Sequence, residues 1–168
     1  MTELLEVIDE KNRVLRLAPR RQCHEQGLPH KAVHVHVFDS KGRLYLQKRG
    51  VHTDRFPLYW DSSCAGHVSP GESLEDAANR ELEEELGLRG KLVKKMDLRW
   101  RLKYKSLVEN EFIRLYHLVT RKQPKPRKGE LAGGKWVTLP ELDEMILLKK
   151  EKVAPSLEII RWFSQAPS

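Results

Sequence analysis

Hydrophobic and polar residues alternate with a period of two in several short stretches of the chain, which predicts β-strands. The clearest stretch is residues 31–39, where Val33, Val35 and Val37 alternate with other side chains. A Ser-Lys-Gly turn follows, and residues 43–49 alternate again, so the two stretches predict a β-hairpin. Further strands are predicted at residues 3–8, 13–18, 91–104, 107–120 and 136–138.

A helix is predicted at residues 74–86, which are rich in Ala, Leu, Arg and Glu. Ser73 is a suitable N-cap residue and Gly87 a suitable C-terminal stop. Two more helices, each opened by a proline, are predicted at residues 140–150 and 155–165, with loops at 50–64 and 121–130. Because short segments of both periods follow one another without a repeat or an evident linker, we expect one mixed α/β domain over residues 1–168.

The composition is that of a soluble globular protein, with 39% hydrophobic residues and no apolar stretch long enough to cross a membrane. The 31 Lys and Arg residues exceed the 24 Asp and Glu residues, and the net charge of +7 favours an anionic partner such as phosphate. Cys23 and Cys64 are too few for a disulfide framework, and the start of the chain has no signal-peptide pattern. We therefore expect a cytoplasmic protein with no membrane partner.

Three glutamates, Glu81, Glu84 and Glu85, fall within an arc of about 100° on the helix predicted at residues 74–86. Two carboxylates about 5 Å apart repel by about 3 kcal/mol at an effective dielectric constant of 20. Negative charge is also unfavourable in the last turn of a helix. A solvated acidic face leaves both penalties unexplained, whereas a bound divalent cation removes both, so the spacing indicates a metal site.

Residues 66–88 match the Nudix box, G-x5-E-x7-R-E-U-x-E-E-x-G-U, in which U is a bulky aliphatic residue. All nine defined positions are filled, by Gly66, Glu72, Arg80, Glu81, Leu82, Glu84, Glu85, Gly87 and Leu88. The chain therefore resembles the Nudix hydrolase superfamily. The resemblance implies a Nudix-like α/β/α sandwich with a mixed β-sheet, and it implies cleavage of a diphosphate linkage with Mg²⁺ or Mn²⁺ as cofactor.

The resemblance also implies roles for residues of the motif. Glu81, Glu84 and Glu85 match the metal ligands of the family, which the carbonyl oxygen of Gly66 often assists. Arg80 is expected to orient Glu81 through a charge-assisted hydrogen bond. Glu84, Glu85 and Arg80 are therefore expected in the catalytic machinery.

An acid outside the motif commonly serves as base or as an additional ligand in this family. Glu111 and Glu109 are the candidates, and Glu130 in a later loop competes with them.

A second resemblance extends over nearly the whole chain, to the isopentenyl-diphosphate isomerases and their hydrolase-like relatives. It rests on His30, the Lys41-Gly42 turn, Arg49, the segment 56–60, the Gly66-His67 pair and Glu109-Asn110-Glu111. In the isomerases the matching histidines and glutamates build a metal site separate from the Nudix helix. This resemblance implies a candidate second metal site at His30, His67, Glu109 and Glu111.

The other histidines receive little weight. The remaining histidine of the isomerase site aligns nearer Cys23 than His24, so His24 has no assigned role. His34 and His36 are expected to be hydrogen-bonded structural residues. Arg49 is a candidate phosphate contact.

Two departures argue against isomerisation, which needs a proton donor and a proton acceptor on opposite faces of an alkene. The isomerases use the Cys before Gly-His, but that position is Ala65 here, and Cys64 is expected to point to the opposite face of an extended segment. The isomerases also place a Trp after a late proline to stabilise a carbocation, whereas Ser156 follows Pro155 here.

The Nudix box, by contrast, is complete in this chain and degraded in the isomerases. The leading hypothesis is therefore a hydrolase acting on a small-molecule diphosphate such as a nucleoside diphosphate derivative. An isopentenyl-diphosphate isomerase is the alternative, and a nucleotide-binding sensor is third. No nucleic acid polymer is expected as a partner, and the choice between a monomer and a homodimer stays open.

Overall fold

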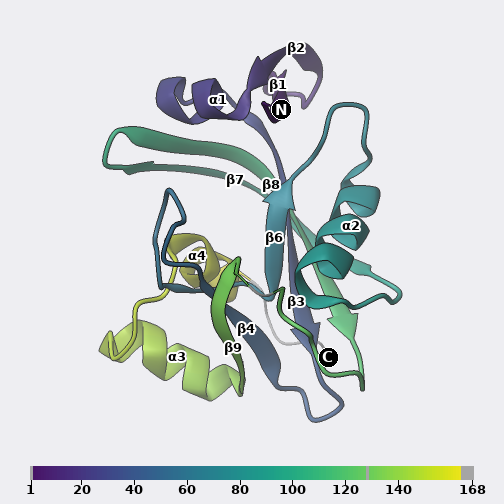
Figure 1. The fold of residues 1–168 in the computed structure, drawn as a ribbon, viewed down its shortest axis with the longest axis vertical. Helices are drawn as coiled ribbons and strands as arrows, with labels where there is room; N and C mark the ends of the chain where they lie inside the picture. The colour runs from purple at the N-terminus through teal and green to yellow at the C-terminus, as the bar shows by residue number, and fades with distance from the viewer. Residues whose placement is uncertain (1, 128, 164–168) are drawn as a thin grey trace.

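The computed structural model describes residues 2–127 and 129–163, and within them seven strands form one mixed sheet (Figure 1). The main path runs through β5 (Trp60–Asp61), β4 (Leu44–Arg49), β3 (His30–Phe38), β8 (Leu107–Val119) and β7 (Val93–Tyr104). Off this path, β6 (Cys64–His67) pairs with β3 and β9 (Leu131–Val137) pairs with β4. Strands β3 and β8 are parallel, and the other neighbours are antiparallel.

Helices cover both faces of this sheet (Figure 1). Helix α2 (Leu74–Leu86) lies on one side, and α3 (Leu139–Leu148) and α4 (Pro155–Phe163) lie on the other. At one end of the molecule, β1 (Leu4–Ile8) and β2 (Val14–Pro19) form a separate two-stranded sheet beside α1 (Arg20–Gln26). The arrangement confirms the predicted α/β/α sandwich with a mixed sheet.

The alternating side chains of β3 explain this layering. Val33, Val35 and Val37 are fully buried in one hydrophobic cluster with Leu82 and Leu86 of α2. The other face of the sheet packs on the C-terminal helices, where a second cluster joins Phe38 and Leu44 to Leu142, Met145, Ile146 and Leu157. The burial of apolar side chains on β3 and β4 thus stabilises the helix layers on both faces of the sheet.

The hairpin predicted at residues 31–39 and 43–49 forms its turn but not its ladder. Strands β3 and β4 are paired only at Phe38 and Leu44, and they diverge from there. Along residues 32–35, β3 instead pairs with β6, and along its whole length it pairs with β8. The prediction assumed that consecutive strands stay paired, whereas here the sheet divides into two arms with a space between them.

Helix α2 begins and ends as the sequence predicts. The side chain of Ser73 accepts a hydrogen bond from the backbone N–H of Asp76, and Gly87 adopts the left-handed conformation at φ = 61°. The predicted loop at 121–130 has a further role, because its backbone N–H groups at Lys125 and Arg127 donate to the last carbonyl groups of α2. This loop therefore caps the end of the helix that carries the glutamates.

Four elements differ from the sequence prediction. Helix α1 was not predicted, β9 begins at Leu131 rather than at residue 136, and β5 and β6 interrupt or border a stretch predicted as loop. Helix α4 is described to Phe163, so positions 164 and 165 of the predicted helix lie outside the described residues.

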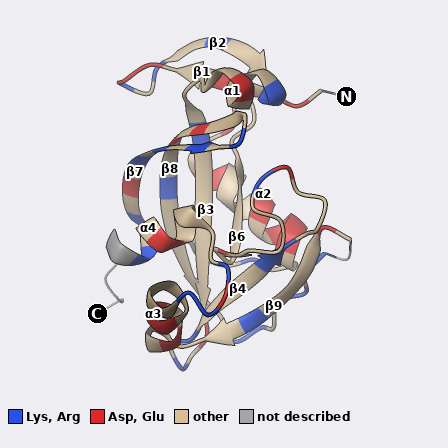
Figure 2. Cartoon of the chain, turned by 90° about the vertical axis from the view of Figure 1, so that its left-hand side faces the viewer, with Lys and Arg blue, Asp and Glu red and all other residues tan. Residues whose placement is uncertain are grey.

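The charges are unevenly spread, with basic residues along β7 and acidic residues on α2 (Figure 2). No helix in the described part of the chain is both long and apolar enough to span a bilayer.

Candidate active site

A pocket of about 590 Å³ opens where β3 and β4 diverge. Its walls come from both arms of the sheet, from α2 and from the loop after β4. The residues that line it include His34, Gln47, Arg49, Arg55, Asp61, Ala65, Gly66, His67, Glu85, Glu109, Glu111, Glu130 and Ser156. The predicted residues Arg49, Gly66, His67, Glu85, Glu109, Glu111 and Glu130 thus share one cavity, whereas His30, Arg80, Glu81 and Glu84 do not line it.

Arg80 is the centre of a hydrogen-bond network beneath the pocket. Its Nη1 lies 2.6 Å from Oε1 of Glu81, and its Nε and Nη2 bond both carboxylate oxygens of Glu72 at 2.8 and 2.9 Å. Nη2 also donates to the backbone carbonyl of His67 at 3.0 Å. Because four bonds fix the guanidinium, the Glu81 carboxylate is held in one orientation, as the motif implied.

Gly66 is the glycine against which Glu81 lies. A Cβ atom at position 66 would overlap the carboxyl carbon and Oε1 of Glu81, so no other residue fits here without moving that side chain. Burial raises the pKa of Glu81, although its bond with Arg80 opposes the shift. The close approach places the Glu81 carboxylate beside the bare backbone of β6.

Glu85 carries the most perturbed carboxylate on α2. It lines the pocket, and its Oε2 is buried without a hydrogen-bond partner. Burial, followed by the charge of Glu81, raises the pKa of Glu85 to about 8. Glu84 differs, because its side chain is 49% exposed and lies 3.6 Å from Nη1 of Arg80. A buried carboxylate oxygen with no protein donor, next to a second carboxylate, fits the binding of a divalent cation.

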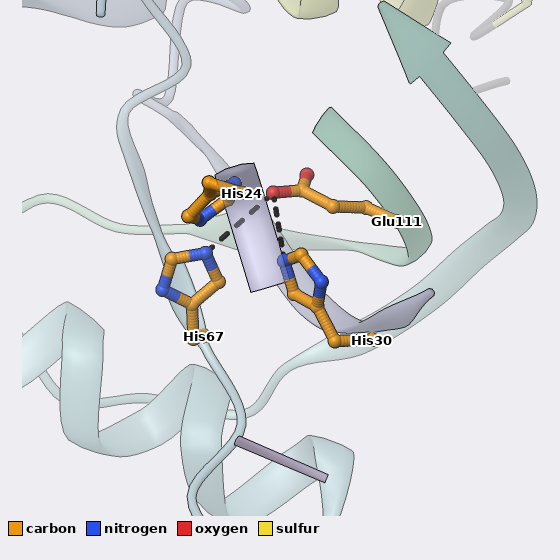
Figure 3. Close-up of side chains that lie close together, drawn as sticks. All are labelled: His24, His30, His67 and Glu111. Carbon is orange, nitrogen blue, oxygen red and sulfur yellow. Dashed lines mark ion pairs between the residues drawn. The ribbon is translucent and has the colours of Figure 1, made fainter. Parts of the chain in front are cut away.

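A second candidate metal site lies in the same region, where three histidines and one glutamate gather (Figure 3). One ligand atom each from His24, His30, His67 and Glu111 lies within 4.8 Å of the others, and among residues 2–127 and 129–163 no other group of this kind occurs. Oε1 of Glu111 lies 3.5 Å from Nε2 of His30 and 3.6 Å from Nε2 of His67. The Nε2 atoms of His24 and His30 are buried without hydrogen bonds, so this donor set also fits a divalent cation.

The topology explains how these four residues meet. His30 lies directly opposite Glu111 in the parallel β3–β8 ladder, and His67 pairs with Ala32 in the β3–β6 ladder. Helix α1 adds His24 from outside the sheet, and its ring centroid lies 4.9 Å from that of His30. The group thus collects residues from four elements that are distant in sequence.

Glu109 is not part of this group, although the sequence placed it there. Its carboxylate lies 2.8 Å from Nη1 of Arg55 and accepts a hydrogen bond from Nε1 of Trp100 at 2.9 Å. His24 occupies the fourth position instead, and Cys23, which the alignment favoured, is buried in an apolar cluster. The sequence missed His24 because the resemblance placed the remaining histidine of the isomerase site nearer Cys23.

The electrostatics of the group follow from burial and close partners. Burial, then the charge of Arg55, lowers the pKa of His24 to about 3, so its ring is neutral and free to ligate. Burial alone would raise the pKa of Glu111, but the close contacts with His30 and His67 hold that pKa well below its usual range. Glu111 is therefore ionised at neutral pH.

The positions that separate isomerases from this chain are also resolved. Ala65 is paired with His34, and both line the pocket. Cys64 is paired with Val35 and has 0% exposure within the cluster beneath α2, where burial raises the pKa of its thiol well above the usual value. Ser156 also lines the pocket.

The remaining predicted residues are paired with neighbours. Arg49 donates from Nη1 to Asp61 at 2.8 Å and from Nε to the carbonyl of Arg55 at 3.0 Å. Glu130 lies at the pocket wall, 3.4 Å from Nη1 of Arg127.

A family model described as NUDIX domain matches residues 28–163 of this chain. The chain belongs to the Nudix family. The match includes the loop and helix that carry Gly66, Arg80 and the three glutamates, so the motif and the fold agree.

Curated relatives of this Nudix chain are named isomerases. It is 37% identical over 142 residues to the isopentenyl-diphosphate Delta-isomerase of Mycolicibacterium vanbaalenii, which covers 80% of this chain and 77% of that protein. It is 33% identical over 145 residues to the enzyme of the same name from Burkholderia multivorans, with 86% and 82% covered.

Solved structures with the same fold carry other names. The protein DR0079 from Deinococcus radiodurans matches with a TM-score of 0.80 and 22% identity, covering 97% of this chain and 100% of that one. An Ap4A hydrolase from C. elegans matches with a TM-score of 0.56 and 21% identity, covering 79% and 93%. These structures show the shared fold alone, and the choice between a hydrolase and an isomerase depends on the site.

Proposed function

We propose that this chain is a metal-dependent hydrolase that cleaves the diphosphate linkage of a small molecule by attack of water on phosphorus. The observation that carries the proposal is the identity and placement of the residues at positions 64 and 65. Ala65 faces the pocket and has no proton to give, whereas the Cys64 thiol is sealed in the core. A double bond held in this pocket has no thiol beside it to supply the proton that isomerisation requires.

An isopentenyl-diphosphate isomerase is the second candidate. It is favoured by the group of His24, His30, His67 and Glu111, because the resemblance to the isomerases implies a metal site built from such residues. The names of the curated relatives favour it as well. Against it stand Ala65 and Ser156, which replace the two residues that handle the proton and the carbocation.

Glu81, Glu84 and Glu85, with the carbonyl oxygen of Gly66, would hold Mg²⁺ or Mn²⁺. When bound, the cation neutralises the charge on the diphosphate and activates it toward water. Arg80 fixes Glu81 for this purpose, and the unpartnered Oε2 of Glu85 supplies a ligand atom that no protein donor occupies. Arg49 contributes positive charge at the same wall and is the proposed phosphate contact.

Glu111 has two proposed roles, and both are compatible with the proposed hydrolase function. Its side chain lines the pocket, where it is proposed to accept a proton from the attacking water. Its position between His30 and His67 equally suits a ligand of a second metal ion. In that second site, His24 would take the position that the sequence assigned to Glu109.

The test is incubation of the purified chain with Mg²⁺ and a panel of nucleoside diphosphates, nucleotide sugars, dinucleotides and prenyl diphosphates. Hydrolysis releases phosphate or a monophosphate, and the variant Cys64→Ala retains this activity. Conversion of isopentenyl to dimethylallyl diphosphate without phosphate release would replace the proposal with the isomerase. Thermal stabilisation by a substrate without any turnover would leave a binding protein.

A reducing, cytoplasmic location is part of the proposal, because Cys23 and Cys64 are both free and buried. The proposed partner is a small-molecule diphosphate rather than a nucleic acid polymer.

A further inference from the structure

Glu109 lies next to the histidine site, which is the group of His24, His30, His67 and Glu111. Glu109 and Glu111 are two residues apart on β8, so their side chains leave the same face of the strand. Glu111 lies opposite His30 at the end of the β3–β8 ladder, and Glu109 continues β8 beyond that end. Strand geometry alone would therefore place a second carboxylate at the edge of the histidine site.

Two donors occupy the Glu109 carboxylate instead. Its Oε1 lies 2.8 Å from Nη1 of Arg55, and its Oε2 accepts a hydrogen bond from Nε1 of Trp100 at 2.9 Å. The side chains of Arg55 and Glu109 are only 8% and 12% exposed, so salt and water screen this ion pair little. Breaking the pair would leave a buried charge without a partner, which keeps the two side chains together.

Arg55 also lies beside two members of the histidine site. Its Nη1 is 3.2 Å from Nδ1 of His24 and 4.0 Å from Oε1 of Glu111. Arg55 and Glu109 both line the pocket as well. Because an arginine keeps its proton throughout the physiological pH range, the histidine site has a permanent positive charge at its edge, and Glu109 is its partner.

We propose that Arg55 is a positioning residue that keeps Glu109 out of the coordination shell of a divalent cation bound at the histidine site. Three neutral imidazoles and one carboxylate leave such a cation with a net positive charge, which favours an anionic ligand in the pocket. An ion that prefers six ligands also keeps two positions for oxygens of water or of a diphosphate. Glu109 as a fifth protein ligand would neutralise that charge and take one of these positions.

The test titrates the full chain with Co²⁺ in the absence of substrate, so it is independent of the proposed hydrolase function. The visible absorption of bound Co²⁺ depends on the kind and number of its ligands. Glu109→Gln is expected to leave the spectrum of the saturated protein unchanged, because Glu109 is not a ligand. Glu111→Gln, the matched variant on the same strand, is expected to change the spectrum and to weaken Co²⁺ binding by at least about tenfold.

Arg55→Met is expected to strengthen Co²⁺ binding. Without the guanidinium, Glu109 is free to ligate and the site gains a negative charge, so the Kd for Co²⁺ falls by at least about tenfold and the spectrum changes. A purely structural role for Arg55 predicts weaker binding instead. The double variant Arg55→Met/Glu109→Gln is expected to return the spectrum to that of the parent and the Kd to within about threefold of the parent value.

Three results would overturn the inference. A changed spectrum in Glu109→Gln would make Glu109 a ligand in spite of Arg55, and this comparison decides the question even where Arg55→Met does not fold. A parent-like spectrum in folded Arg55→Met would mean that Arg55 withholds no ligand. A parent spectrum that His30→Asn leaves intact would place the bound Co²⁺ outside the histidine site.

Discussion

Nη1 of Arg55 lies 2.8 Å from Oε1 of Glu109, with both side chains almost closed to solvent. The same guanidinium atom lies 3.2 Å from Nδ1 of His24. A fixed positive charge therefore sits beside the group of three histidines and holds Glu109 away from it. This contact is the physical reason why Glu111 alone supplies a carboxylate to that group.

Arg55→Met is expected to lower the free energy of unfolding by about 3 kcal/mol, because it leaves the Glu109 carboxylate buried and unpaired. The double variant Arg55→Met/Glu109→Gln is expected to recover most of the loss, and denaturant titration measures both. Arg13→Met, which breaks an exposed pair with Asp9, is the control and costs less than about 1 kcal/mol. Additive losses in the double variant would contradict a direct pairing.

Gly66→Ala is expected to lower both stability and turnover, because the new methyl group displaces the Glu81 carboxylate. Overpacking of this kind costs about 1–3 kcal/mol. In a Glu81→Ala background the same change is expected to cost much less, since the obstructing side chain is gone. Urea unfolding of the four proteins gives the coupling energy, and a value near zero would rule out the contact.

Glu85→Gln is expected to reduce turnover by orders of magnitude while the metal-free chain unfolds at the same or higher free energy. The reason is that Glu85 is buried without a partner for Oε2 and its pKa is raised to about 8, so a neutral amide removes no favourable charge contact from the metal-free chain. The stabilisation that Mg²⁺ or Mn²⁺ gives to the parent should be lost in the variant. The control is Glu83→Gln, because Glu83 is exposed and pairs with Arg89, and it is expected to keep normal turnover. Unchanged activity in Glu85→Gln would remove this residue from the mechanism.

Stability is expected to fall as the pH drops below about 6.5, in part because of His117. Burial, then the charge of Lys95, lowers the pKa of His117 to about 4 in the folded chain. Between about pH 4 and pH 6.5, His117 binds a proton in the unfolded chain but not in the folded chain. Lowering the pH in this range therefore favours unfolding by up to about 1.4 kcal/mol per pH unit. His117→Asn should reduce this slope in unfolding titrations between pH 4 and 6.5. An unaltered slope would mean that His117 titrates equally in both states.

The sequence predicted the elements whose local pattern agrees with their packing. The alternation of Val33, Val35 and Val37 identified β3 because one face of that strand is fully buried, and the capped helix α2 was found to the residue. Strand β9 was largely missed because Gly133 and Gly134 break the pattern. Gly134 is needed there, since a Cβ atom would overlap the hydroxyl of Tyr45. A contact with a distant residue therefore requires glycine at position 134, although local propensity disfavours glycine in a strand.

The two candidate metal sites differed in how far the sequence could predict them. The Nudix glutamates lie on one helix, so their spacing alone predicts a shared face. His24 lies on α1, whose seven residues include only two buried side chains and show no helical apolar period. Its position beside His30 and His67 depends on how α1 packs against the sheet. The spacing of residues along the chain gives no information about that packing.

The most direct test of the central claim is a reaction in ¹⁸O-labelled water and D₂O with Mg²⁺, run with isopentenyl diphosphate and with the panel described above. The account predicts that ¹⁸O enters a released phosphate or monophosphate and that no deuterium enters a prenyl chain. Deuterated dimethylallyl diphosphate with an intact diphosphate, and no labelled phosphate from any substrate, would contradict it.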